Sequence, residues 1–101
     1  MDRLTAILKE TMTGYTGKAL NGYSYLTSSE DQSLFTVVSV GYLPDKRFVD
    51  TGLIARIVDN VIIIEHDGNN KMLVDALVQQ GVPRAQIVLA YAGEPVPELL
   101  R

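Results

Sequence analysis

Apolar residues recur with two different periods along the chain, and the change of period separates helices from strands. Residues 3–15 carry one helical stripe of apolar side chains, made of Leu4, Ile7, Leu8, Met12 and Tyr15. The stripe predicts an N-terminal helix that covers one face of a sheet, although such a stripe is also suited to docking on a partner protein. The next residues, Lys18 to Asn21, are predicted to form a loop.

Four segments with strand character follow, at residues 23–27, 34–43, 47–58 and 61–65. Their connections are a polar cluster at 28–32, the turn Pro44-Asp45-Lys46, and Asp59-Asn60, two residue types that tolerate the positive φ of a tight hairpin. Connections this short favour antiparallel neighbours, so we predict a four-stranded antiparallel meander.

The pattern within these strands indicates what each one faces. In the third strand Val49, Leu53, Ala55 and Ile57 alternate with polar or small residues, which predicts one buried and one solvated face. The fourth strand, residues 61–65, is apolar on both parities, and we place it inside the sheet. Gly41, in the second strand, indicates a bulge or a close approach of two backbones.

A second helical stripe, with Met72, Leu73, Ala76 and Leu77, follows a turn at 67–70 in which Asn69 or Asn70 is predicted to cap the helix. Gly81 has the place of a left-handed C-terminal residue, Val82 can pack back on Leu77, and Pro83 opens a tight turn through Gln86.

The chain then has a fifth predicted strand, Ile87 to Tyr91, and an extended arm, 92–101, with two prolines. The predicted fold class is α+β, with an N-terminal helix, a four-stranded antiparallel meander, a second helix and a fifth strand, and with the helices packed on one face of the sheet. Residues 1–101 are predicted to form a single domain.

Composition narrows the class of protein. The 101 residues are 47% apolar and 21% charged, with a formal net charge of -3 and no cysteine. These values are typical of a globular domain without disulfides or thiolate sites. The N-terminus has no apolar signal region and no apolar run, Val61 to Ile64 included, is long enough to span a membrane, so we expect a cytoplasmic protein with no membrane partner.

No stretch predicts a catalytic residue, a cofactor site or a metal ligand set. His66 lies between Glu65 and Asp67, but adjacent strand residues point to opposite faces and do not converge on one ion. Asp67 and Asn69 have calcium-loop spacing, but Lys71 occupies the third ligand position and the twelfth lacks a glutamate. There is no nucleophile elbow and no glycine-rich phosphate loop.

Direct nucleic-acid binding is an alternative that the sequence disfavours and leaves open. The hairpin 47–65 has the form of a β-ribbon, from which Arg47 and Arg56 are candidate interaction residues. Three acidic residues on the same hairpin, Asp50, Asp59 and Glu65, oppose a phosphate surface.

Several short motifs occur in a characteristic order: Val40-Gly41-Tyr42, Asp59-Asn60, Glu65-His66-Asp67-Gly68, and the stretch Gly81 to Tyr91. In this order the chain resembles the XisI family, the fdxN element excision controlling factors of cyanobacteria. The positions that carry the resemblance, which we interpret as structural, are Gly41, Tyr42, Asp67, Gly68, Gly81, Val82, Pro83, Ile87, Val88 and Leu89.

The resemblance implies a small non-catalytic accessory protein for the programmed excision of a DNA element by a site-specific recombinase during heterocyst differentiation. It implies a protein partner of the XisH type, in a complex that can include the recombinase, and no cofactor. On physical grounds we also expect a homodimer, formed through the C-terminal arm or an exposed sheet face.

Three departures mark a divergent member of the family. Family members commonly have Gly-Trp where this chain has Gly41-Tyr42, and a tryptophan in the strand where this chain has only isoleucines, at 62–64. The usual C-terminal extension is replaced by the short arm with Pro95 and Pro97.

Overall fold

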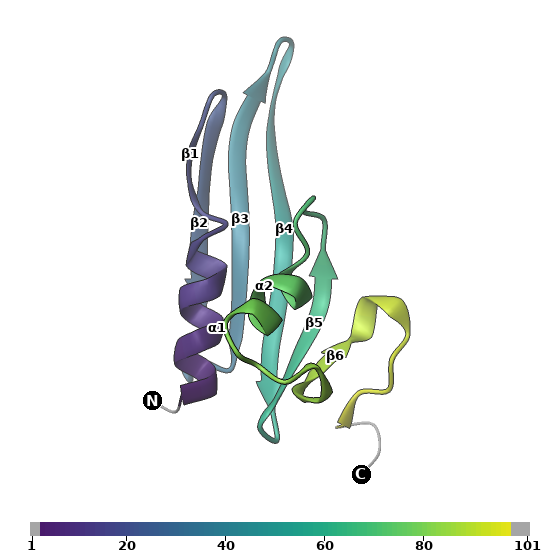
Figure 1. Cartoon of the computed structure of the whole chain (residues 1–101). Coiled ribbons are helices and arrows are strands. Elements are labelled where there is room, and N and C mark those ends of the chain that lie inside the picture. The colour runs from purple at the N-terminus through teal and green to yellow at the C-terminus, as the bar shows by residue number, and fades with distance from the viewer. Residues whose placement is uncertain (1–2, 98–101) are drawn as a thin grey trace.

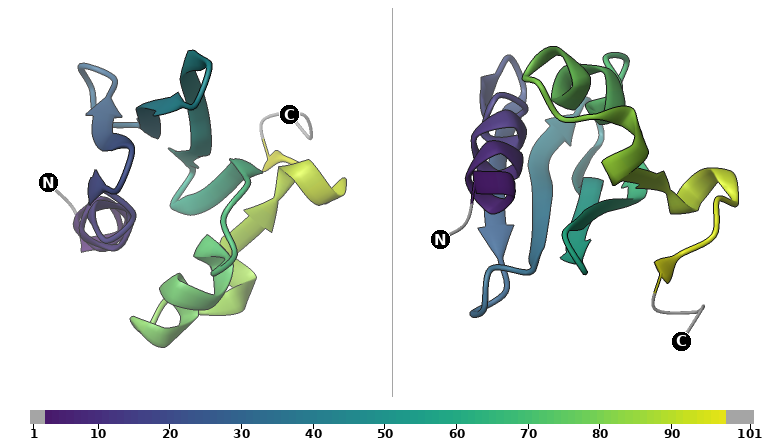
Figure 2. Two further views of the ribbon diagram at one scale, coloured as in Figure 1. Left: turned by 90° about the horizontal axis from the view of Figure 1, so that it is seen from above. Right: turned by 60° about the horizontal axis from the view of Figure 1, so that its bottom comes forward.

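The computed structural model describes residues 3–97, which form a six-stranded sheet with two helices on one of its faces (Figures 1 and 2). The helices are α1 (Arg3–Thr13) and α2 (Leu73–Gln79). The strands are β1 (Gly17–Ala19), β2 (Gly22–Ser28), β3 (Leu34–Leu43), β4 (Lys46–Val58), β5 (Val61–Asp67) and β6 (Ile87–Leu89). Two 3-10 turns, η1 (Arg84–Gln86) and η2 (Ala90–Ala92), flank β6. The predicted α+β class is confirmed.

The strands lie in the sheet in the order in which they occur in the chain, β1 to β6. Neighbours are antiparallel except β6, which pairs in parallel with β5 after the crossover through α2. The placement of β5 inside the sheet is confirmed. The predicted strand number is wrong, because β1 pairs with β2, with Lys18 opposite Tyr23, where a loop was expected. A three-residue strand with a glycine and a lysine has too few apolar positions to show alternation.

The core lies between the helices and the sheet. Leu4, Leu8 and Met12 of α1 and Leu73 and Leu77 of α2 are buried there, so the predicted stripes face the sheet. The sheet contributes Phe35, Val37, Leu53, Ala55, Ile62 and Ile64, and the turn before β6 contributes Val82. α1 ends at Thr13, directly before Gly14, whose N–H closes a tighter turn by donating to the Thr11 carbonyl at 3.1 Å.

Two β-bulges change which face the side chains of β4 and β5 occupy. Val37 pairs with Leu53 and Val38 with Thr51, which leaves Gly52 as the extra residue in β4. Leu53 is fully buried on the helix side, whereas Val49, four residues earlier and therefore on the same parity as Leu53, is 59% exposed on the other face. The single alternation predicted for residues 47–58 is therefore wrong, because the bulge reverses the two faces at Gly52.

Gly41 is a site of close backbone approach, as predicted, but it is not a bulge. A Cβ at Gly41 would lie 2.7 Å from the Asn21 carbonyl oxygen and 2.8 Å from the ring of Phe48, its partner in β4. The Phe48 ring therefore occupies the space that a side chain at Gly41 would fill. This contact explains the glycine of the Gly41-Tyr42 motif in structural terms.

We expect Gly41→Ala to lower the free energy of unfolding by about 1–3 kcal/mol, because the Phe48 ring must move and the Asn21 carbonyl is backbone. Urea denaturation measures this change. Gly52→Ala is the matched control, since a Cβ at Gly52 meets no atom within 4 Å. Equal midpoints for the two variants would contradict the expected clash.

The end of α2 at Gly81 agrees with its prediction. Gly81 has φ +97°, and the N–H of Val82 donates to the Leu77 carbonyl at 3.1 Å, as in a Schellman motif. The Gln86 N–H donates to the Pro83 carbonyl at 2.9 Å, which closes the predicted tight turn. The hairpin at Asp59-Asn60 is also confirmed, with φ of 51° and 63°.

The end of the chain differs from its prediction. β6 stops at Leu89, and Tyr91 lies in η2 rather than in the strand, because the Gly93 N–H donates to the Ala90 carbonyl at 3.0 Å. The predicted arm, 92–101, begins in this turn and not as extended chain, and its residues 98–101 lie outside the described residues.

Candidate interaction surfaces

The face of the sheet opposite the helices carries a group of exposed apolar side chains. Tyr23 of β2 lies opposite Val40 of β3, which lies opposite Val49 of β4. Residues directly opposite one another in antiparallel strands project from the same face. The tyrosine face comprises Tyr23, Tyr25, Val38, Val40, Tyr42 and Val49. Both helices pack against the other side, so the tyrosine face has no second layer within residues 3–97.

The tyrosines of this face are accessible, and two of them form an aromatic pair. The rings of Tyr23 and Tyr25 have centroids 4.7 Å apart and are tilted by 39°. Tyr23, Tyr25 and Tyr42 are 44%, 50% and 64% exposed. Tyrosine combines a large apolar ring with a hydroxyl group that can still hydrogen-bond, and it is enriched in protein–protein interfaces. An exposed sheet face with this composition is suited to binding another macromolecule.

The charged residues of this face include both arginines that the sequence singled out. Arg47 lies opposite Tyr42, close to the turn that joins β3 to β4, and is exposed. Arg56 lies opposite Ile63 and donates from Nε to the Glu65 carboxylate at 2.7 Å. Nine positions along one strand separate the two arginines, roughly 30 Å. The structure therefore places Arg47 and Arg56 on one face but does not bring them together.

The three residues Glu65, His66 and Asp67 have separate positions. Glu65 is the extra residue of the second bulge, since Ala55 pairs with Ile64 and Ile54 with His66. Beyond the bulge His66 is exposed, and Asp67 lies on the helix side opposite the buried Leu53. Within residues 3–97 no three histidine, aspartate or glutamate side chains are grouped so as to hold a metal ion.

Asp67 fixes the connection between β5 and α2. One carboxylate oxygen accepts from the Asn69 backbone N–H at 3.0 Å and from its side-chain amide at 2.9 Å. The other oxygen accepts from the N–H of Leu73, the first residue of α2, at 2.6 Å. The predicted cap by Asn69 or Asn70 is therefore wrong, because Asp67 reaches the helix from the strand end.

Gly68 completes the same connection. Its N–H donates to the carbonyl of Gly52 at 2.9 Å, on the outer side of the β4 bulge. The Asp67-Gly68 motif thus links the bulge, the end of β5 and the start of α2. In this connection both residues have a structural role.

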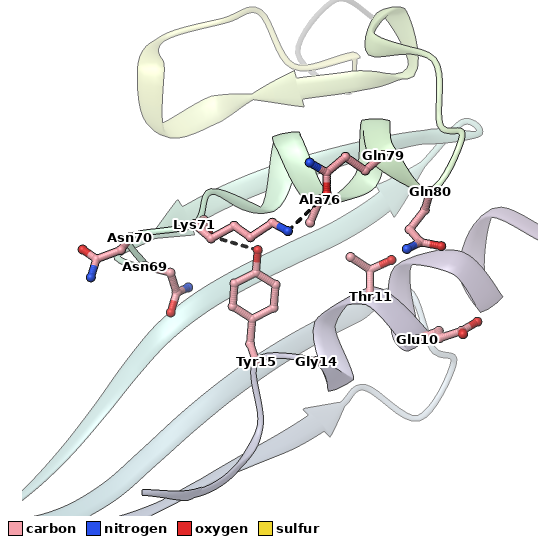
Figure 3. Close-up of a pocket in the computed structure, with 10 residues that line it drawn as sticks. All are labelled: Glu10, Thr11, Gly14, Tyr15, Asn69, Asn70, Lys71, Ala76, Gln79 and Gln80. Carbon is pink, nitrogen blue, oxygen red and sulfur yellow. Dashed lines mark hydrogen bonds between the residues drawn. The ribbon is translucent and has the colours of Figure 1, made fainter.

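A groove of about 520 Å³ lies between the end of α1 and α2 (Figure 3). The Tyr15 hydroxyl donates to the Lys71 carbonyl at 2.9 Å, and the Lys71 ammonium donates to the Gln79 side chain at 3.1 Å. Burial raises the pKa of the Tyr15 phenol, and the negative charges of Asp67 and Asp75 raise it further. These contacts fasten α1 to the segment that follows Asp67.

The raised pKa of Tyr15 gives an expected pH dependence. The neutral phenol is favoured in the folded state, so its contribution to stability is complete below the unfolded pKa of about 10 and is lost as pH rises through the folded pKa. We expect the urea midpoint to fall above about pH 10 in the wild type and to fall less in Tyr15→Phe. Tyr42→Phe, at an exposed tyrosine, is the control and should retain the wild-type slope.

The tyrosine face as a whole was not predicted from the sequence. Tyr42 was singled out as a motif residue, but Tyr23, Tyr25 and Val49 were not predicted to form a surface with it. The aromatic alternation in 23–27 was a usable signal, whereas the exposure of Val49 depends on the bulge at Gly52. None of the helices in the described part of the chain has the length and apolar character needed to cross a membrane.

The chain is similar to known proteins in both sequence and fold. A model of the family described as XisI protein matches residues 1–99. A crystal structure of a XisI-like protein from Anabaena variabilis ATCC 29413 is similar, with a TM-score of 0.73 and 22% identity over 93% of this chain and 86% of that chain. A second, the fdxN element excision controlling factor XisI from the same organism, has a TM-score of 0.64 and 21% identity over 94% of this chain and 92% of that chain. No curated protein sequence matches significantly. The match to the family model spans nearly the whole chain, and the chain therefore belongs to the XisI family.

Proposed function

We propose that this protein is a non-catalytic controlling factor for the excision of a DNA element, and that it acts by binding a protein partner of the XisH type on the tyrosine face. Membership of the XisI family supports the general role, and one similar structure is named as an excision controlling factor. The observation that carries the binding mode is the accessible aromatic group on a sheet face without a second layer.

The chemistry of the described residues agrees with a binding role. The carboxylate of Asp67 and the hydroxyl of Tyr15 are engaged in fixing the loop before α2. Glu65 is held by Arg56, and Glu94 accepts from the Leu89 N–H at 2.8 Å. These groups are engaged in contacts that support the fold. The tyrosine face takes no part in those contacts and is accessible to another molecule.

Co-expression with an XisH-type protein tests the proposal. We expect the two chains to co-purify and to form a complex at micromolar concentration, with the tyrosine face protected from hydrogen exchange or chemical labelling at Tyr23 and Tyr25. Absence of a complex at micromolar concentration, with both proteins folded, would contradict the proposed function.

Direct DNA binding is the alternative, and one observation favours it. Lys18 and Arg47 lie on the tyrosine face, and its acidic residue among the described strands, Glu65, is neutralised by Arg56. Base stacking on tyrosines combined with cations is a mode of nucleic-acid binding. This mode requires that the logarithm of the affinity falls steeply with the logarithm of the salt concentration. If labelled DNA shows no mobility shift at low salt, direct DNA binding is excluded.

A further inference from the structure

The described part of the sheet has edges of very different character. β1 is three residues long. The outer edge of β6 is covered by side chains: Arg84 donates to the Ile87 carbonyl at 2.7 Å, and the Leu89 N–H donates to the Glu94 carboxylate at 2.8 Å. Short strands and covered backbone groups are the usual protections of a sheet edge.

The first half of β4 is a third edge, and it is long and uncovered. β5 pairs with β4 only from Leu53 to Val58, so residues 46–51 have a neighbouring strand, β3, on one side alone. Figure 1 shows this upper part of β4 with no strand beside it on the side away from β3. The loop that follows β5 reaches β4 only at Gly52, through the Gly68 N–H.

The direction of the backbone groups on this edge follows from the contacts of Tyr42. Its N–H donates to the Asn21 carbonyl at 2.8 Å, and its carbonyl accepts from the Asn21 side chain at 2.9 Å, so both groups point away from β4. Arg47, directly opposite Tyr42, is therefore in a pair without hydrogen bonds, and its own N–H and carbonyl point outward. By alternation the same holds for Val49 and Thr51.

We propose that this edge pairs with the same edge of a second copy of the chain, β4 antiparallel to β4, and so joins two sheets into one. The occupant is inferred from the charges along the edge. Residues 46–51 read Lys-Arg-Phe-Val-Asp-Thr, with a cation near one end and Asp50 near the other. Two antiparallel copies bring these opposite charges together, which a parallel arrangement does not.

The structure also restricts the register. A two-fold axis perpendicular to the sheet requires that the side chains of each cross-strand residue pair project from the same face. Residues whose backbone N–H and carbonyl groups point outward must also pair with one another. Centring the pairing on Val49 would place Lys46 opposite Gly52, whose carbonyl already accepts from Gly68. Centring it on Arg47 would place two arginines opposite each other. Centring it on Phe48 leaves Lys46 opposite Asp50 twice, Arg47 opposite Val49 twice, and the two Phe48 rings adjacent.

This arrangement extends the surface described above. The same two-fold axis puts the tyrosine faces of both copies on one side of a continuous sheet, with the Val49 side chains near the junction. The dimer does not depend on the proposed function, because the edge contains all the groups that the pairing uses.

Sedimentation velocity on the full chain without any partner tests the proposal. We expect a dimer in the wild type and a dissociation constant raised about tenfold in Asp50→Lys, since two attractive pairs become repulsive. Lys46→Asp combined with Asp50→Lys restores the opposite charges and should return the dissociation constant to the wild-type range. Glu30→Lys, an equal charge change in the exposed loop before β3, is the control and should have no effect.

A backbone variant gives an independent test. Val49→Pro removes an outward N–H that β3 does not use, so the hairpin should fold, as thermal denaturation will show, while the dimer is lost. A wild-type chain that is monomeric at about 1 mM, the weak limit of specific association, would overturn the proposal. So would a folded Val49→Pro dimer, or a double charge variant as weak as Asp50→Lys.

Discussion

Replacing Asp67 with alanine is expected to lower the free energy of unfolding by about 2–4 kcal/mol, a large part of the 5–15 kcal/mol typical of a domain. The Asp67 carboxylate accepts three hydrogen bonds, from two donors of Asn69 and from the first N–H of α2. Hydrogen bonds to a charged acceptor are stronger than neutral ones, and the lost acceptor leaves a part-buried helix N-terminus without a partner.

A graded series separates the cap from a general charge effect. Asp67→Asn retains one acceptor oxygen and should cost less than Asp67→Ala, whereas Asp45→Ala, at an exposed aspartate in the β3–β4 turn, should change stability by less than about 0.5 kcal/mol. Urea denaturation gives the energies, and hydrogen exchange at the Leu73 amide should accelerate in both Asp67 variants. An unchanged midpoint in Asp67→Ala would contradict the role assigned to this carboxylate.

The features that were predictable from sequence are those set by residues close together in the chain. Alternation and turn chemistry located β2 to β5, and the positive φ at Asp59 and Gly81 falls where the residue types indicated it. The helix stripes identified Leu8 and Leu77 as core. Each of these depends on local conformation or on burial averaged over one element.

The features that were missed depend on pairing between strands. Gly52 is a bulge only because Val37 and Val38 take Leu53 and Thr51 as partners, and nothing within residues 47–58 specifies that register. The bulge carries Val49 to the tyrosine face and leaves the Gly52 carbonyl available to Gly68. Asp67 reaches α2 because the bulge at Glu65 turns it to the helix side. The candidate surface was therefore less predictable than the fold.

Which side chains of β2 face the core was also not predictable from the sequence. The alternation of Tyr23 and Tyr25 with Ser24 and Leu26 indicates that the two tyrosines share a face, and the larger side chains would ordinarily be assigned to the core. In the structure Leu26 packs against the core and the tyrosines are exposed. This unexpected exposure of aromatic residues is the observation on which the proposed binding surface is based.

The double variant Tyr23→Ala with Tyr25→Ala is expected to weaken binding of an XisH-type partner by more than about 100-fold, equivalent to roughly 3 kcal/mol. The two rings lie 4.7 Å apart and form the aromatic pair of the tyrosine face, and truncation of a hot-spot tyrosine in an interface costs about 2 kcal/mol or more. Because both rings are exposed in the free chain, the variant should remain folded. Isothermal titration calorimetry with the purified partner measures the loss.

Two further variants show whether the loss belongs to this surface. Tyr91→Ala removes a tyrosine of similar exposure from η2, beyond β6, and should leave the affinity within about threefold of the wild type. Tyr23→Phe with Tyr25→Phe keeps the rings and removes the hydroxyl groups. This variant therefore separates the apolar contribution to the binding affinity from the contribution of hydrogen bonds. A partner that binds the alanine double variant as tightly as the wild type would show that the aromatic group is not the docking site, even if the complex itself forms. A loss of affinity in Tyr91→Ala alone would place the interface at the β6 edge instead.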